Sequence, residues 1–113
     1  MSDLTKRHCV PCEGGTAPFT KKEAEKYLEI VSNWELLSGE IMSIQRKFVF
    51  KDFKQALEFT NKVANLAESE GHHPDIFIHN FRKVDITLST HAIGGLSTND
   101  FILAAKINQL LGQ

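Results

Sequence analysis

The spacing of apolar residues changes period several times along this chain, and this change most constrains the fold. Residues 20–31, 52–70 and 97–111 carry apolar side chains at helical spacing. Residues 42–50 and 84–88 instead alternate apolar with polar side chains, which is the pattern of a half-buried strand. Segments 34–37 and 76–79 each precede one of these runs and are separated from it by residues typical of a turn. Each segment is therefore predicted to pair with the run that follows it. The predicted order is helix, strand, strand, helix, strand, strand, helix.

Paired strands between helices predict an α+β fold, in which an antiparallel sheet carries the helices on one face. The 113 residues are enough for one domain. We place this domain at residues 19–113, after an irregular N-terminal arm at residues 1–18. The other face of the sheet is left to solvent or to a partner subunit.

Residue types that start and end helices mark the expected boundaries. Thr20 with Glu23 predicts a capping box, and Asp52 is a predicted N-cap. Gly71 is expected to end the middle helix, because glycine adopts a left-handed backbone at little cost, and Pro74 prevents the helix from resuming. The apolar stripe expected on the middle helix is Phe53, Leu57, Thr60, Ala64 and Ala67.

Charge and hydropathy argue against several partners. The formal net charge is -1 with dispersed Lys and Arg, whereas a protein that binds a nucleic-acid backbone usually has a basic face. No apolar run reaches the length of a membrane span, and the N-terminus lacks the pattern of a secretory signal. We therefore expect a cytoplasmic protein with neither a nucleic-acid nor a membrane partner.

Cys9 and Cys12 form a C-x-x-C pair beside His8. Such a pair is typical of a redox motif or of half a zinc site. The sequence has no second cysteine pair, and no strand-then-helix context of the thioredoxin type surrounds this one. Reduced thiols in a turn are the favoured interpretation, and a metal shared across an oligomer interface stays open as the weaker one.

His72, His73 and His91 fall at the ends of predicted elements, where a sheet could bring them to one cleft. His8 in the arm and His79 inside a strand are better explained as solvated and spacer residues. Imidazole donates and accepts protons near neutral pH, so a cluster of histidines suits general acid–base chemistry. Spacing alone does not establish that the side chains meet.

Two carboxylates bear on the same site. Glu68 lies one helical turn before His72 and could orient an imidazole, whereas helix capping is the stronger interpretation of Asp100. Three histidines and a carboxylate also resemble a zinc ligand set. Adjacent side chains in an extended segment point apart, which makes joint ligation by His72 and His73 awkward. Metal binding is therefore ranked below acid–base chemistry.

A wider pattern joins the two histidine regions. Its members are Glu68, the His72-His73-Pro74 run, Phe81, His91 and Asp100, together with the phrase V-x-I-x-L-x-T-H over residues 84–91. This pattern resembles the signature of the pterin-4a-carbinolamine dehydratase family. The chain departs from many members at Gly71, where they carry an acidic or amide residue, and from some at Ile93, where they carry Cys.

The resemblance implies a four-stranded antiparallel sheet with three helices, in a homodimer or a homotetramer built as a dimer of dimers. It implies a hydro-lyase that dehydrates a 4a-hydroxytetrahydropterin to the quinonoid dihydropterin in tetrahydrobiopterin recycling, without a metal or organic cofactor. Of the three implied catalytic histidines, His72 and His91 would transfer protons and His73 would mainly hold the pterin. The implied substrate-binding residues are Glu68, Pro74, Thr90, Ala92, Ile93 and Asp100.

A second class of function stays open, namely a protein-binding dimerisation module without a catalytic role. Animal members of the family are linked with a transcription-factor dimerisation domain. The expected cue is an exposed apolar stripe on a helix, and the last helix is apolar on more than one face. The residues concerned are Phe101, Ile102, Leu103, Ile107, Leu110 and Leu111.

Overall fold

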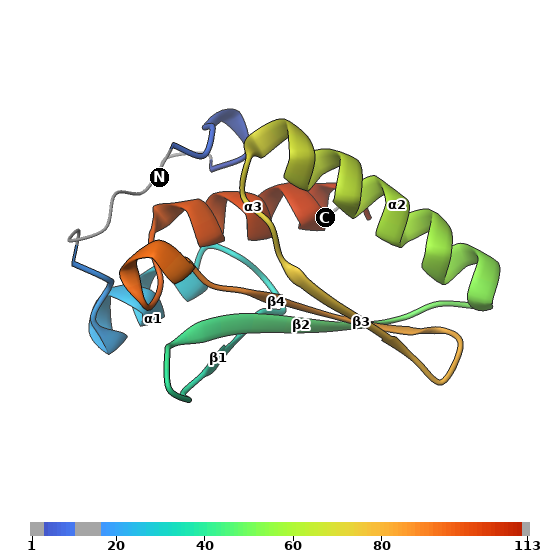
Figure 1. The fold of residues 1–113 in the computed structure, drawn as a ribbon, viewed down its shortest axis with the longest axis horizontal. Coiled ribbons are helices and arrows are strands. Elements are labelled where there is room, and N and C mark those ends of the chain that lie inside the picture. The colour runs from blue at the N-terminus through green and yellow to red at the C-terminus, as the bar shows by residue number, and fades with distance from the viewer. Residues whose placement is uncertain (1–3, 11–16, 112–113) are drawn as a thin grey trace.

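The strands of the computed structural model, which describes residues 4–10 and 17–111, form one antiparallel sheet (Figure 1). Strands β1 (Glu35–Leu37) and β2 (Ser43–Val49) make the first hairpin, and β3 (Asp75–His79) and β4 (Lys83–Leu88) make the second. Because β2 also pairs with β4, the strand order is β1-β2-β4-β3. Both predicted hairpins are confirmed.

Alternation along β4 decides which face of the sheet is covered. Val84, Ile86 and Leu88 are each 0% exposed and belong to the core, while the residues between them are half-buried. The helices lie on the side of the sheet that these apolar residues form (Figure 1). The predicted α+β class and the predicted order of elements are confirmed.

The helices begin and end largely where the sequence places them. Their bounds are α1 (Lys21–Leu28), α2 (Phe53–Glu70) and α3 (Thr98–Gln109), with short 3-10 helices η1 (Leu4–Lys6) and η2 (His91–Ile93). Thr20 and Glu23 form the predicted capping box, and the side chain of Asp52 accepts from the backbone N–H of Gln55 at 2.8 Å. None of the helices in the described ranges is long and apolar enough to cross a membrane.

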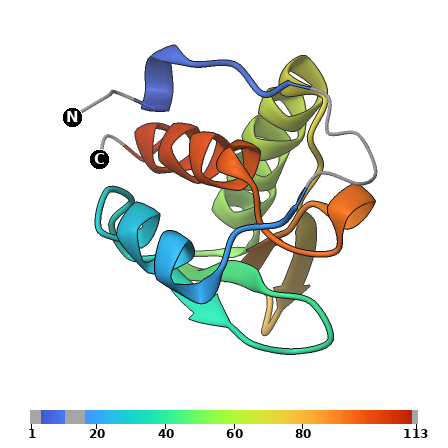
Figure 2. The ribbon, with the colours of Figure 1, turned by 90° about the vertical axis from the view of Figure 1, so that its left-hand side faces the viewer.

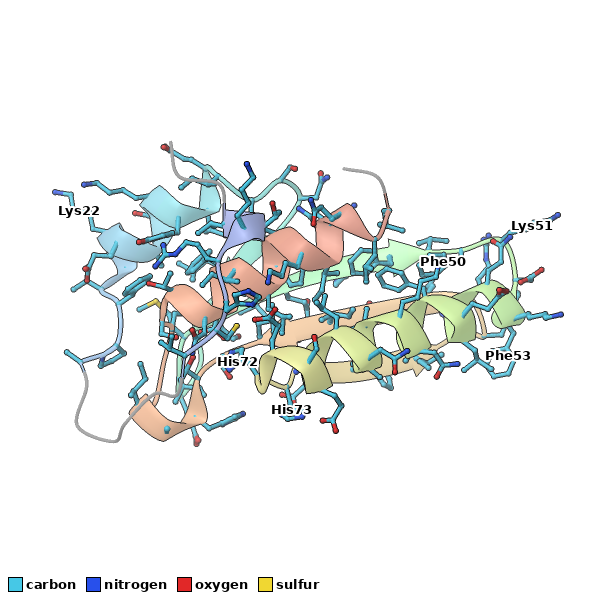
Figure 3. The ribbon with its side chains drawn as sticks, turned by 90° about the horizontal axis from the view of Figure 1, so that it is seen from above. Lys22, Phe50, Lys51, Phe53, His72 and His73 are labelled. Atoms are coloured by element: carbon cyan, nitrogen blue, oxygen red, sulfur yellow. The ribbon has the colours of Figure 1, made fainter. Side chains whose placement is uncertain are left out.

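The predicted apolar stripe on α2 is wrong for most of its members. Phe53 is 50% exposed and Leu57 is 38% exposed, and Figure 3 shows Phe53 on the outer side of the helix start. The residues of α2 that are buried are Ala56, Phe59, Val63 and Ala67. Phe59 decides the rotation of the helix, because its ring packs 4.8 Å and 4.9 Å from the rings of Phe48 and Phe50.

Helix α3 is apolar on several faces because the chain itself covers it. Figure 2 shows α3 between α1 and α2 with η1 above it. Leu4 of η1 is 2% exposed and belongs to the core, although the arm was expected to be irregular. The ring of Phe101 lies 5.2 Å from that of Tyr27 in α1. The predicted docking cue on this helix is therefore largely used within the chain, although Leu111 is 37% exposed.

Candidate active site

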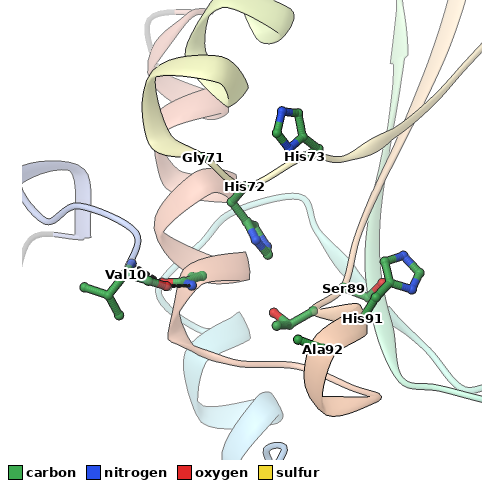
Figure 4. A pocket seen from close by; sticks show the side chains of 9 residues that line it. Val10, Gly71, His72, His73, Ser89, His91 and Ala92 are labelled. Carbon is green, nitrogen blue, oxygen red and sulfur yellow. Dashed lines mark hydrogen bonds between the residues drawn. The ribbon is translucent and has the colours of Figure 1, made fainter. Parts of the chain in front are cut away.

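A pocket of about 290 Å³ lies between the end of α2, the end of β4 with η2, and the arm before α1 (Figure 4). Its walls are formed by Val10, Gly71, His72, His73, Ser89, Thr90, His91, Ala92 and Asn99. This volume is near the lower end of the ~300–1,000 Å³ range of small-molecule sites, so the pocket suits one small ligand. The fold thus brings His91 to the same pocket as the adjacent histidines.

The end of α2 fixes the directions of His72 and His73. Gly71 has a left-handed φ of 65°, and the backbone N–H groups of Gly71 and His72 both donate to the carbonyl of Ala67. Pro74 follows and keeps the chain extended into β3. Neighbouring side chains of an extended segment point to opposite sides, and the two rings accordingly leave the chain in different directions (Figure 4).

His72 contacts a buried carboxylate. Its Nε2 lies 2.7 Å from Oδ1 of Asp100, and the side chains are 12% and 0% exposed. The other oxygen, Oδ2, accepts from the Thr90 hydroxyl at 2.8 Å and from the Ser97 backbone N–H at 3.0 Å. Asp100 therefore caps α3 and also holds an imidazole. A carboxylate fixed in this way orients the ring.

His73 has a different carboxylate partner. Its Nε2 lies 2.5 Å from Oε2 of Glu68, and the two side chains are 63% and 76% exposed. Glu68 was expected to orient an imidazole, and the imidazole that it contacts is that of His73. An exposed contact of this kind contributes at most ~1 kcal/mol to stability, so it restricts the ring without stabilising the fold appreciably.

His91 is positioned by backbone hydrogen bonds of the short loop in which it lies. The N–H of Thr90 donates to the carbonyl of Gly95 at 2.7 Å, and the N–H of Gly95 donates back at 3.3 Å. These bonds close a short loop around η2, whose first residue is His91. The His91 side chain is exposed and makes no hydrogen bond to any residue in the described ranges. Its ring nitrogens are therefore available to a ligand.

The predicted substrate-binding residues divide into three groups. Thr90 and Ala92 line the pocket, Glu68 and Asp100 contact histidines, and Pro74 and Ile93 are not among the wall residues. Sequence reasoning missed the wall residues Val10, Gly71, Ser89 and Asn99. No local sequence pattern could identify Val10 as a wall residue, since its partner Asn99 lies 89 residues away in the sequence. Asn99 could have been suspected only as the neighbour of Asp100.

The metal alternative finds no support among the residues that the structure covers. No group of three or more His, Cys, Asp or Glu side chains there is arranged to hold a metal ion. Cys12 lies outside the described residues, so only Cys9 of the C-x-x-C pair can be placed. Burial, reinforced by the charge of Glu70, raises the pKa of the Cys9 thiol to about 12. Cys9 is therefore a neutral thiol near neutral pH.

The sheet, its helical layer and the histidine-lined pocket define an α+β protein with a candidate small-molecule site. The chain belongs to the pterin 4 alpha carbinolamine dehydratase family, since the model of that family matches residues 17–110. The predicted family is confirmed. The predicted enzyme class, a hydro-lyase, is confirmed as well, because it is the class that the names of the relatives state.

Relatives match nearly the whole chain. A Chlorobaculum tepidum protein that carries the pterin-4-alpha-carbinolamine dehydratase name is 45% identical over 112 residues, covering 98% of this chain and 100% of that protein. Pterin-4-alpha-carbinolamine dehydratase 2, mitochondrial, of Arabidopsis thaliana is 43% identical over 97% of this chain and 60% of its own.

Solved structures agree with the fold. The Brucella melitensis structure described as a transcriptional coactivator/pterin dehydratase has a TM-score of 0.75 at 35% identity, covering 82% of this chain and 97% of that one. A pterin dehydratase-like protein described as a RuBisCO assembly factor in the alpha-carboxysome has a TM-score of 0.61 at 26% identity, covering 72% and 92%.

Proposed function

We propose that the chain removes water from a 4a-hydroxytetrahydropterin to give the quinonoid dihydropterin, as a step in tetrahydrobiopterin recycling. Family membership supports the substrate class. The observation that carries the mechanism is that His72, His73 and His91 line one small pocket, with Asp100 buried behind His72.

The chemistry needs two proton transfers and no further reagent. The substrate carries a hydroxyl group on carbon C4a, next to ring nitrogen N5. An acid protonates the hydroxyl, the N5 lone pair expels it as water, and a base removes the proton from N5. A double bond between C4a and N5 results. Imidazoles can supply both the acid and the base near neutral pH.

We assign the two proton transfers to His72 and His91. Asp100 fixes the His72 ring, which suits a group that gains and loses a proton in each turnover. The His91 ring is exposed at the pocket and has no partner in the described ranges that would compete with a substrate. His73, whose Nε2 contacts Glu68, would chiefly hold the pterin.

A direct absorbance assay with a synthetic 4a-hydroxytetrahydropterin tests this assignment. His72→Ala and His91→Ala are each expected to lower kcat by about 10²–10⁴-fold, with an unchanged circular dichroism spectrum. The matched control is His79→Ala, because His79 lies on β3 outside the pocket walls and contacts Asp85. It should retain the parent's kcat. A double variant of His72 and His91 that dehydrates as fast as the parent would show the assignment to be wrong.

A protein-binding role is the second candidate. Phe53 and Leu57 expose apolar surface on the outer face of α2. The Brucella melitensis relative is described as a coactivator as well as a dehydratase. Self-association into a homodimer or homotetramer would use such a surface equally well. Light scattering measures the oligomeric state, and a pull-down that recovers only this chain would count against a different partner.

A further inference from the structure

The arm residue Val10 is tied to the pocket by a two-point contact. Its backbone N–H donates to Oδ1 of Asn99 at 3.0 Å, and Nδ2 of Asn99 donates to the Val10 carbonyl at 2.5 Å (Figure 4). Asn99 is 4% exposed. The Asn99 carboxamide thus pairs with both polar groups of one backbone residue, as a neighbouring strand would. Val10 and Asn99 both belong to the pocket wall.

The residue before Val10 is held by a second buried side chain. The backbone N–H of Cys9 donates to Oε1 of Glu70 at 2.8 Å, and Nζ of Lys106 donates to Oε2 at 2.6 Å. The Glu70 side chain is 6% exposed. Burial raises the pKa of Glu70, but the hydrogen bonds from Lys106 and Cys9 outweigh burial and hold that pKa below 4.5. Glu70 is therefore charged near neutral pH.

Both holding residues adjoin the proposed catalytic machinery in the sequence. Asn99 directly precedes Asp100, and Glu70 lies two residues before His72. The same two helix ends therefore place the arm and the His72–Asp100 pair. At its other end the arm is anchored by Leu4, which is buried in the core.

We propose that the arm at Val10 forms a substrate-binding wall of the pocket, and that Asn99 and Glu70 are positioning residues that hold this wall against a bound pterin through Val10 and Cys9. The identity of the ligand rests on the proposed function. Loosening the wall removes no proton-transfer group. It should therefore weaken substrate binding and raise KM, while kcat stays near that of the parent.

Kinetics on the full chain provide the first test. Asn99→Ala should raise KM for a 4a-hydroxytetrahydropterin by about fivefold to tenfold and change kcat by less than about twofold. Val10→Pro removes the backbone donor without altering Asn99 or its neighbour Asp100. Its KM should exceed that of Val10→Ala, which keeps the N–H. Asn65→Ala, on the exposed side of α2, is the control with parental KM and kcat.

Alkylation of Cys9 by iodoacetamide, in a Cys12→Ser background, provides a second measurement that needs no turnover. The thiol of the half-buried Cys9 donates to the Asn99 carbonyl at 3.6 Å, so it should react slowly. Asn99→Ala and Glu70→Gln should each speed the reaction by about tenfold or more. Saturating 7,8-dihydrobiopterin should slow it in the Cys12→Ser parent.

The outcomes separate this inference from the proposed function. If Asn99→Ala speeds Cys9 alkylation but keeps the KM of the parent, the arm is released without any effect on substrate binding. That result would overturn the inference. Unchanged alkylation in both Asn99→Ala and Glu70→Gln would overturn it as well. If the parent does not dehydrate the substrate, the proposed function fails, and protection of Cys9 by 7,8-dihydrobiopterin then decides the inference alone.

Discussion

Nε2 of His72 lies 2.7 Å from Oδ1 of Asp100, a carboxylate that is completely buried. The contact joins the end of α2 to the start of α3 across 28 residues of sequence. The second oxygen of the same carboxylate caps α3. One side chain thus serves helix formation and the orientation of an imidazole, and substitutions there should affect both properties.

Asp100→Asn is expected to lower kcat by about 10²-fold or more. It should also reduce the free energy of unfolding by about 1–3 kcal/mol. The amide presents Nδ2, a donor, where the carboxylate presents its second acceptor oxygen, so one of the bonds to His72, Thr90 and Ser97 must be lost or reversed. Turnover assays and urea denaturation measure the two losses. Asp75→Asn, at an exposed carboxylate, should change neither quantity, and an Asp100→Asn variant with parental kcat would contradict the role of the pair.

His73→Ala is expected to raise KM by about tenfold and to lower kcat by less than about threefold, because its proposed role is to hold the pterin. The free energy of unfolding should change by less than about 1 kcal/mol, since the Glu68 contact is exposed. Steady-state kinetics separate the two constants. A loss of kcat as large as that of His72→Ala would instead make His73 a proton-transfer group.

Gly71→Ala is expected to lower the free energy of unfolding by about 1 kcal/mol. The cost comes from the backbone, because φ at Gly71 is +65° and no heavy atom lies within 4 Å of the added Cβ. Urea denaturation measures it. Gly39→Ala is the matched control, since the new Cβ there meets only an ordinary contact at 3.7 Å. Equal stability of the two variants would contradict the backbone argument.

Glu70→Gln is expected to lower the free energy of unfolding by about 1–3 kcal/mol near neutral pH. The folded state lowers the pKa of Glu70, so its contribution is fully present above the ordinary value of 4.5 and is lost as pH falls through the lower folded-state value. The gap between parent and variant should therefore close in acid. Urea denaturation at a series of pH values measures this gap. Glu58→Gln, at an exposed carboxylate, is the control, and its difference from the parent should not change with pH.

The order of elements could be predicted because hydrophobic period and capping residues are local properties of the sequence. The rotation of α2 could not. Two stripes of helical spacing run along that helix, one through Leu57 and one through Phe59. Only contacts with the rings of Phe48 and Phe50, which belong to another part of the chain, select the second.

The candidate site divides in the same way. Gly71 and Pro74 predict a fixed helix exit, so the positions of His72 and His73 follow from their neighbours. The partner of each imidazole does not follow, because Glu68 and Asp100 were both available. The contact of Val10 with Asn99 spans 89 residues, and no local pattern encodes it.

The double use of Asp100 has a consequence for mutational screens. Substitutions at His91 should yield abundant protein that has lost its activity, because the His91 side chain is exposed and caps no helix. Substitutions at Asp100 should deplete the protein itself, so a screen scored by cellular abundance would detect position 100 and miss position 91. Comparing an abundance screen with an activity screen would therefore distinguish the residue that builds the site from the one proposed to act in it.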